Sequence, residues 1–187
     1  MDPRIEAYLE KNREWASGKN YLPPIPFVDM QRTGRERLDG TVIVVACTDP
    51  RVTPEEFLGM DSSSKATVVR TAGGRVHAAV STLLVLSAVG NAGKKGTIMV
   101  VHHTNCGLQG ADEESIRRVL RESAHGEGEE IESLLEGVRF GAFESPDESV
   151  KEDVGVLKAS PFFRGMQIFG FVQDTATGLL REVVGTQ

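Results

Sequence analysis

Three runs of β-branched and apolar residues organise the first half of the chain. They cover residues 41–46, 66–70 and 97–101. Their nearly continuous apolar character is typical of strands that are covered on both faces. Between them, residues 53–56 have the form of a capping box at a helix start, and an apolar helix is predicted over about 76–89. Strands that alternate with helices predict an α/β fold with a central, mostly parallel β-sheet flanked by helices.

The second half of the chain predicts three helices and a C-terminal β-hairpin. Polar and acidic segments with helical spacing cover about 112–124, 130–138 and 145–157. The apolar run 167–172 and the run 179–183 then flank a short turn that contains glycine. Two strands joined by such a turn are typical of an antiparallel pair.

The N-terminal segment predicts a helical arm. Residues 4–17 place apolar side chains roughly on one side of a helix, and the three prolines within 21–27 favour an extended chain after it. Such an arm either embraces a partner subunit or packs on its own domain. We expect a single domain over 1–187, with the arm in 1–39 and the α/β core in 40–187.

Composition and charge restrict the class of partner. The 187 residues carry 21 basic and 27 acidic side chains, a net charge of −6, without a block of Lys and Arg. This balance argues against nucleic acid or an anionic membrane as the main partner. The longest nearly apolar run, 78–89, is too short to span a bilayer. With no visible targeting segment, and only two cysteines, we expect a cytoplasmic protein whose thiols serve chemistry or a metal.

Both cysteines lie at the carboxyl ends of predicted buried strands. The first strand ends in Cys47 and is followed by Asp49, and the third is followed by His103 and Cys106. Ligands of open α/β sheets bind at the carboxyl ends of the strands, so we expect these segments to face each other. Two thiolates, an imidazole and a carboxylate are ligand types that zinc accepts in tetrahedral geometry. The alternative is a pair of buried thiols without metal.

Three motifs in one frame resemble the β-class carbonic anhydrases, and in particular the short, mycobacterial-type branch of that family. The motifs are 47–51 (Cys-Thr-Asp-Pro-Arg), 69–74 (Val-Arg-Thr-Ala-Gly-Gly) and 103–107 (His-Thr-Asn-Cys-Gly). The resemblance runs from about residue 40 to the C-terminal hairpin. It implies a zinc enzyme that hydrates carbon dioxide to bicarbonate by means of a metal-bound hydroxide, assembled as a homodimer or a tetramer.

The resemblance also implies roles for individual residues. Cys47, His103 and Cys106 would hold zinc. Asp49 would take the fourth position in a closed state, or pair with Arg51 and leave that position to water.

Other residues have two readings. Gly107 and Gly110 would let the backbone approach a bound anion, or belong to an ordinary turn. Phe57 and Leu58 would line the apolar slot for the substrate, or pack in the core. Gly73-Gly74 would meet an anion or allow tight packing near the metal.

Departures from the family pattern leave the substrate open. Pro50, Thr71 and Asn105 replace the usual Ser, Asn and Asp, while the proposed ligands and the Asp49–Arg51 pair are retained. Family relatives hydrolyse carbonyl sulfide or carbon disulfide on the same scaffold. The alternatives to carbon dioxide hydration are therefore hydrolysis of carbonyl sulfide, which releases hydrogen sulfide and carbon dioxide, and an inactive zinc-binding protein.

Overall fold

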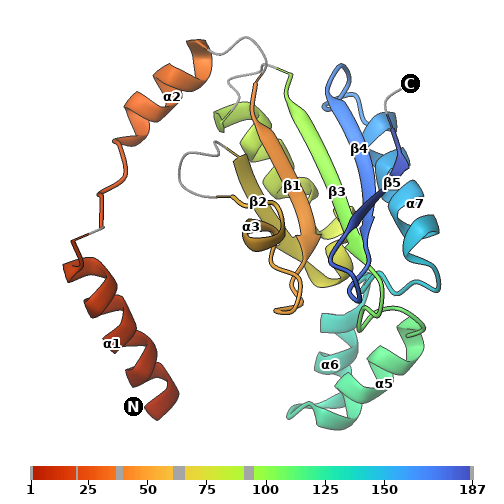
Figure 1. Ribbon diagram of the computed structural model, residues 1–187. Coiled ribbons are helices and arrows are strands. Elements are labelled where there is room, and N and C mark those ends of the chain that lie inside the picture. Colours follow the sequence, from red (N-terminus) through yellow and green to blue (C-terminus); the bar gives the residue numbers. More distant parts are fainter. Residues whose placement is uncertain (1, 20, 37–39, 61–65, 91–94, 186–187) are drawn as a thin grey trace.

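One five-stranded sheet organises the protein (Figure 1). The computed structural model describes residues 2–19, 21–36, 40–60, 66–90 and 95–185. The strand order is β2-β1-β3-β4-β5, in which the first four strands are parallel and β5 is antiparallel to β4. The predicted α/β fold and C-terminal hairpin are thus confirmed. The strands are β1 (Val42–Cys47), β2 (Ala66–Thr71), β3 (Thr97–His103), β4 (Gln167–Gln173) and β5 (Leu180–Val184).

Pairing of β1 with β3 brings together segments that are remote in sequence. Val45 of β1 lies opposite Val69 of β2 on one side and Val100 of β3 on the other. Because these strands are parallel, their carboxyl ends meet at one edge of the sheet. The segments after Cys47 and after His103 therefore lie next to each other, as the sequence predicted.

One face of the sheet is covered by helices, and this interface forms the main core. Side chains of β1, β3 and β4 pack there against η2 (Val76–Ala78), α4 (Val80–Val85) and α7 (Pro146–Ala159). At Gly170 of β4, a Cβ atom would overlap the side chain of Val150, so glycine allows α7 to lie close to the strand. The other helical elements are α1 (Pro3–Ser17), α2 (Phe27–Glu36), α3 (Pro54–Phe57), η1 (Ala72–Gly74), the π-helical turn η3 (Leu86–Gly90), α5 (Glu113–Ser123) and α6 (Gly128–Leu135).

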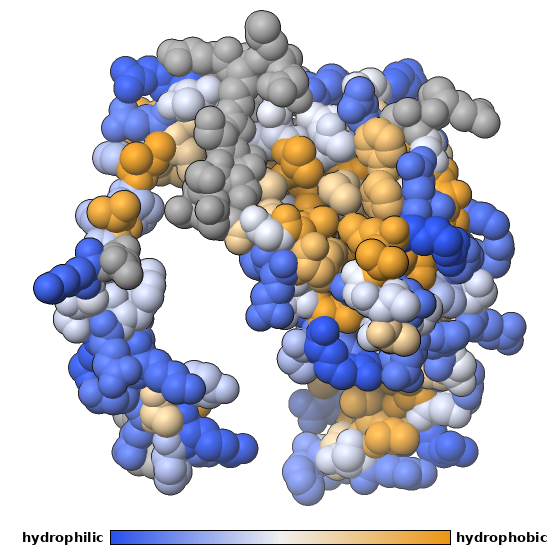
Figure 2. All heavy atoms as spheres, viewed as in Figure 1, coloured by the Kyte–Doolittle hydropathy of each residue, from blue (hydrophilic) through white to orange (hydrophobic). Residues whose placement is uncertain are grey.

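The opposite face of the sheet is apolar and open over much of its area. Val44, Ala46 and Val101 are buried there, whereas the apolar side chains around them are only partly buried. Figure 2 shows hydrophobic side chains gathered over the middle of this face. The partly buried members are Phe57, Leu58, Val68, Met99, Phe171 and Leu180.

The N-terminal arm stands away from this sheet (Figure 1). Helix α1 agrees with the predicted helix and buries none of its side chains. The segment after it is extended, as its prolines require, but the chain then forms α2, which the sequence analysis did not predict. The carbonyl of Pro26 accepts hydrogen bonds from the amides of Asp29 and Met30 and starts this helix.

Two predicted helices differ in detail from the structure. The apolar stretch 76–89 is divided into a 3₁₀ turn, the short helix α4 and a wide final turn, and is not one regular helix. The predicted capping box at 53–56 gives a four-residue helix in which the Thr53 side chain makes no capping hydrogen bond. The box at Ser145 forms as predicted, because Ser145 Oγ accepts from the amide of Glu148. In the part of the chain that is described, no helix is long and apolar enough to cross a membrane.

Helices α5 and α6 extend beyond the carboxyl end of the sheet (Figure 1). Glu113 of α5 connects them to the loop that precedes α7. Its carboxylate accepts hydrogen bonds from the amides of Phe140, Gly141 and Ala142 at 3.0, 2.7 and 3.3 Å. Partial burial raises the pKa of Glu113, but these three donors and the charge of Arg117 lower it by more, so the net pKa is below its ordinary value.

Replacing Glu113 with Gln should destabilise the protein by about 1–2 kcal/mol at pH 7, because charged hydrogen bonds to the loop are lost. A carboxylate with a lowered folded-state pKa stabilises the fold above the ordinary glutamate pKa of about 4.3, and this contribution is lost as the pH falls through the folded-state value. Urea unfolding at one protein concentration should therefore show a difference between the two proteins that shrinks from pH 5 to pH 3. Glu114→Gln, on the same helical turn, should change stability by less than about 0.5 kcal/mol. Equal effects of the two substitutions would contradict this role of Glu113.

Candidate metal centre

Three buried side chains converge at the carboxyl ends of β1 and β3. Cys47 is the last residue of β1, His103 is the last residue of β3, and Cys106 follows three residues later. The Sγ atoms of the two cysteines are 4.0 Å apart, and one ligand atom from each of the three residues lies within 4.8 Å of the others. The structure thus brings together three of the four residues predicted as ligands.

The geometry of this cluster fits zinc. Two sulfur atoms bound to a tetrahedral zinc ion at about 2.3 Å lie about 3.8 Å apart, close to the separation seen here. His103 Nδ1 lies 2.9 Å from the carbonyl oxygen of Thr104, which only accepts, so the proton is on Nδ1. Nε2 is then a free acceptor, and it is buried without a hydrogen-bond partner among the described residues. A buried lone pair beside two thiols is the arrangement that a metal ligand requires.

Without a cation, the two thiols favour a single negative charge. A hydrogen bond from Cys106 is the main reason that the pKa of Cys47 falls to about 4, although burial opposes this change. The neighbouring His103 contributes to the same lowering of the Cys47 pKa. The pKa of Cys106 is raised, because its ionisation would break this hydrogen bond and place a second negative charge in a buried site. Burial lowers the pKa of His103, but its contacts with Cys47, Thr104 and Asp49 raise it by more. A divalent cation would stabilise both thiolates.

Asp49 lies at the edge of the cluster and pairs with Arg51. The Arg51 side chain donates to both carboxylate oxygens, at 3.0 Å from Nε to Oδ1 and 2.5 Å from a terminal nitrogen to Oδ2. These hydrogen bonds hold the pKa of Asp49 well below its usual range, although burial opposes them. Asp49 Oδ2 is 3.9 Å from His103 Nε2. The carboxylate therefore faces the cluster while Arg51 holds it.

Arginine side chains also fix the two segments that carry the cluster. Arg51 donates at 2.9 Å to the carbonyl of Asn105, which lies between His103 and Cys106. Arg70 of β2 donates to the carbonyls of Cys47 and Asp49 at 2.9 and 2.6 Å. Arg70 thus supports the backbone from which Asp49 and Arg51 project.

A cavity of about 550 Å³ opens over the cluster. Of the residues predicted to line the substrate site, Gly107 borders this cavity. Phe57 and Leu58 pack on the open face of the sheet instead. Gly110 donates its amide to the carbonyl of Phe143 with a φ of 74°, as in a turn. The cavity is lined by Cys47, Thr48, Asp49, Pro50, Arg51, Ala72, Gly73, Cys106, Gly107 and Leu108.

Ala72 and Leu108 line the cavity although no sequence pattern predicted them there, and Gly73 was predicted near the metal only together with Gly74. At Gly73 a Cβ atom would lie 2.9 Å from Leu108 Cδ1, so glycine is needed for Leu108 to approach. At Gly74 a Cβ atom would lie 2.9 Å from His102 Cδ2 and 3.0 Å from the carbonyl oxygen of Val101. The glycine pair therefore serves close packing beside the cluster.

His102 points away from the cluster, into the helix side of the sheet. Its Nε2 is 3.2 Å from the Asp153 carboxylate of α7, and its ring stacks on Phe143 with centroids 5.7 Å apart. The Asp153 carboxylate also accepts a hydrogen bond from the amide of Val76 at 3.0 Å and forms an ion pair with the guanidinium of Arg75 at 3.2 Å. This buried polar network attaches α7 to the loop that forms one wall of the cavity.

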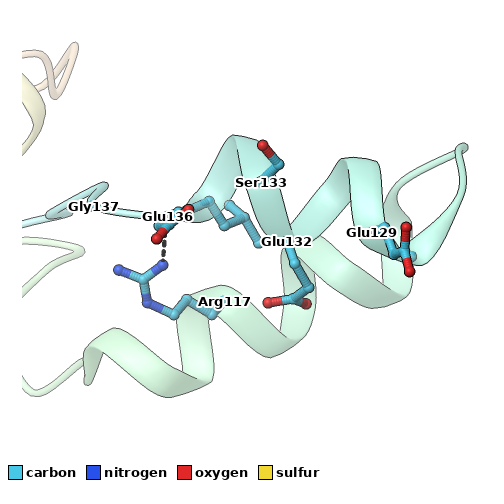
Figure 3. Close-up of a pocket in the computed structure, with 8 residues that line it drawn as sticks. Arg117, Glu129, Glu132, Ser133, Glu136 and Gly137 are labelled. Atoms are coloured by element: carbon cyan, nitrogen blue, oxygen red, sulfur yellow. Dashed lines mark hydrogen bonds between the residues drawn. The ribbon is translucent and has the colours of Figure 1, made fainter.

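A second cavity, of about 670 Å³, lies between α5 and α6. Figure 3 shows its lining, in which Arg117 points toward the end of α6 and donates to the carbonyl of Leu135 at 2.7 Å. Its acidic side chains Glu129, Glu132 and Glu136 are exposed. The cavity has no residue in common with the cluster, and we regard it as a groove between two surface helices.

Comparisons with known proteins agree with this site. The family described as carbonic anhydrase matches residues 42–180, which is more than half of the chain. No curated protein sequence matches the chain. Among solved structures, the carbonic anhydrase of Streptococcus mutans is 27% identical with a TM-score of 0.69, over 96% of this chain and 97% of that chain.

Two further structures show a likeness of fold. The β-carbonic anhydrase isoform I of the protozoan Trichomonas vaginalis has 19% identity and a TM-score of 0.73, over 98% of this chain and 99% of that chain. The apo form of a carbon disulfide hydrolase has 21% identity and a TM-score of 0.59, over 97% and 90%. These matches do not distinguish the short branch that the sequence resembles from other branches. The sheet, the Cys-His-Cys cluster and the family match together place this chain in the carbonic anhydrase family, in its β class.

Proposed function

We propose that this protein hydrates carbon dioxide to bicarbonate, with zinc held by Cys47, His103 and Cys106. The observation that carries the proposal is a buried set of two thiols and one free imidazole nitrogen at the base of a cavity bordered by Asp49 and Arg51. When bound, zinc supplies Lewis acidity, which lowers the pKa of water to about 7 and provides a nucleophile at neutral pH.

The protein residues orient the reactants. Asp49 is fixed by Arg51 and presents Oδ2 toward the cluster, where it accepts a hydrogen bond from water and directs a lone pair of that water into the cavity. Arg70 keeps the backbone of this loop in place. As part of the proposal, Asp49 would serve as a fourth metal ligand in a closed state in which it no longer pairs with Arg51; its Oδ2 lies 3.9 Å from His103 Nε2, close to the other ligands.

A small linear substrate suits the cavity. Ala72, Leu108 and Pro50 give it apolar walls, and Gly107 adds backbone without a side chain. Apolar walls bind an uncharged molecule without the desolvation cost that an ion would have. Carbonyl sulfide differs from carbon dioxide by one larger sulfur atom, so both molecules have to be tested on the same sample.

We also propose a homodimer that uses the N-terminal arm of 1–39. Helix α1 has an apolar stripe of Ile5, Tyr8 and Leu9, each of which is at least 42% exposed to solvent. Leu22, further along the arm, is 83% exposed. An isolated helix of this length is marginal in water without tertiary packing. The open apolar face of the sheet needs a cover of the same character. A second copy supplies both, and two dimers would form a tetramer.

A cytoplasmic location completes the proposal. Cys47 and Cys106 are free, and zinc binding requires both as thiolates. A reducing compartment keeps such thiols available.

Zinc content and turnover should rise together. We expect about one zinc ion per chain by elemental analysis, stopped-flow hydration of carbon dioxide by the loaded protein, and loss of this activity after chelation with recovery on adding zinc. If the same sample released sulfide from carbonyl sulfide faster than it hydrated carbon dioxide, carbonyl sulfide would be the main substrate. Full activity of metal-free protein would disprove the zinc mechanism, and bound zinc with neither activity from pH 6 to 9 would leave only a binding role.

Asp49→Asn should keep zinc bound but lower kcat by about 10²–10⁴-fold, because a neutral amide offers a weaker acceptor and a competing donor. Glu55→Gln, an exposed change on the neighbouring helix, serves as the control and should leave kcat unchanged. An Asp49→Asn enzyme with the turnover of the natural protein would remove Asp49 from the mechanism.

The 20.3 kDa chain should elute and scatter light as a dimer or a larger assembly at micromolar concentration. Leu9→Glu places a charge in the apolar stripe of α1 and should shift the population toward monomer by at least tenfold in dissociation constant, since about 1.5–3 kcal/mol of apolar burial is lost. Ala7→Glu places the same charge on the polar side of α1 and should have no such effect. A monomeric natural protein would contradict the proposed dimer.

A further inference from the structure

The orientation of His103 depends on the carbonyl group of Thr104. The 2.9 Å hydrogen bond from Nδ1 to this oxygen fixes the ring tautomer in which Nε2 is unprotonated. It also fixes the direction of the ring, because the imidazole plane has to contain the Nδ1–H bond. Anything that holds the Thr104 carbonyl in place therefore holds Nε2 toward the two thiols.

The turn of the C-terminal hairpin holds this carbonyl. Thr175 lies between β4 and β5, and its amide donates to Thr104 Oγ1 at 3.0 Å. The two hydroxyl oxygens are 3.0 Å apart, and Thr175 Oγ1 lies 3.3 Å from the carbonyl oxygen of Thr104. One arrangement of protons satisfies all three contacts: the Thr104 hydroxyl donates to Thr175 Oγ1, and the Thr175 hydroxyl donates to the Thr104 carbonyl.

The turn itself is well tied, so that it can serve as a support. Asp174 Oδ1 accepts from the amide of Ala176 at 2.8 Å, and the Asp174 carbonyl accepts from the amide of Gly178 at 2.7 Å. On the other side, the amide of Thr104 donates to the carbonyl of Gln173 at 2.9 Å and continues the pairing of β3 with β4. Thr104 is thus bound to the hairpin through its amide, its hydroxyl and its carbonyl.

We propose that Thr175 is a positioning residue for the metal ligand His103. Its hydroxyl group shares the Thr104 carbonyl with His103 Nδ1 and keeps that oxygen directed at the ring. The C-terminal hairpin thereby contributes to zinc affinity, although none of its residues belongs to the ligand cluster. Partners of ligating histidines typically contribute 10–100-fold to metal affinity. This inference rests on the proposed zinc site but not on the proposed substrate.

Zinc affinity measured by competition with a chromogenic chelator tests the proposal. Thr175→Val keeps the shape of the side chain and removes the hydroxyl group, so the dissociation constant for zinc should rise about tenfold or more. Thr175→Ser restores the hydroxyl group and should return the constant to within about threefold of the natural value. Thr177→Val makes the same chemical change in the same turn, away from Thr104, and should also bind zinc normally.

Two further measurements separate positioning from a general loss of structure. In metal-free protein, at a pH high enough to keep the His103 ring neutral, its ¹⁵N chemical shifts should show Nδ1–H in the natural protein and a mixture of tautomers in Thr175→Val. Thr104→Val removes the other hydroxyl of the pair, and the double variant should bind zinc no more weakly than the poorer single variant. Equal zinc affinities of Thr175→Val and Thr177→Val, or an unchanged His103 tautomer, would overturn the role of Thr175. A natural protein that binds no zinc would overturn the proposed function as well.

Discussion

The parallel pairing of β1 with β3 is the constraint on which the site depends. It brings residues 47 and 103–106 to one edge of the sheet, although more than fifty residues separate them along the chain. Since both strands are central, neither end can shift without breaking pairing on two sides. Backbone hydrogen bonds of the sheet therefore position Cys47 and His103, and the short segment after β3 brings Cys106 to them.

Polar contacts to backbone carbonyls then refine this arrangement. Arg70 supports the loop after β1, Arg51 links that loop to the segment after β3, and the hairpin turn holds Thr104. A metal with fixed bond lengths tolerates little error in the position of its ligands. Carbonyl oxygens are suitable anchors, because their positions follow from the backbone and do not depend on a side-chain rotamer. Such contacts transmit the rigidity of the sheet to the loops.

The two faces of the sheet serve different purposes. The face beneath α7 and α4 is fully covered and provides the main core. The open face retains apolar side chains at intermediate exposure, and helix α1 of the arm buries none of its side chains. A chain that leaves both surfaces open in isolation has the properties of one half of an assembly. The physical cost of exposing them is the driving force for the proposed dimer.

Local patterns along the chain predict the strands, most helices, the fold class and the four residues considered as zinc ligands. These features follow from local periodicity, capping residues and the restricted ligand chemistry of cysteine and histidine, all of which are written along the chain. Only the packed structure places Phe57 and Leu58 on the open face of the sheet and Leu108 in the wall of the cavity. It also revealed the contact between the hairpin turn and Thr104. Such contacts join residues with no fixed spacing in sequence, so they depend on how the finished elements pack and leave no periodic signal.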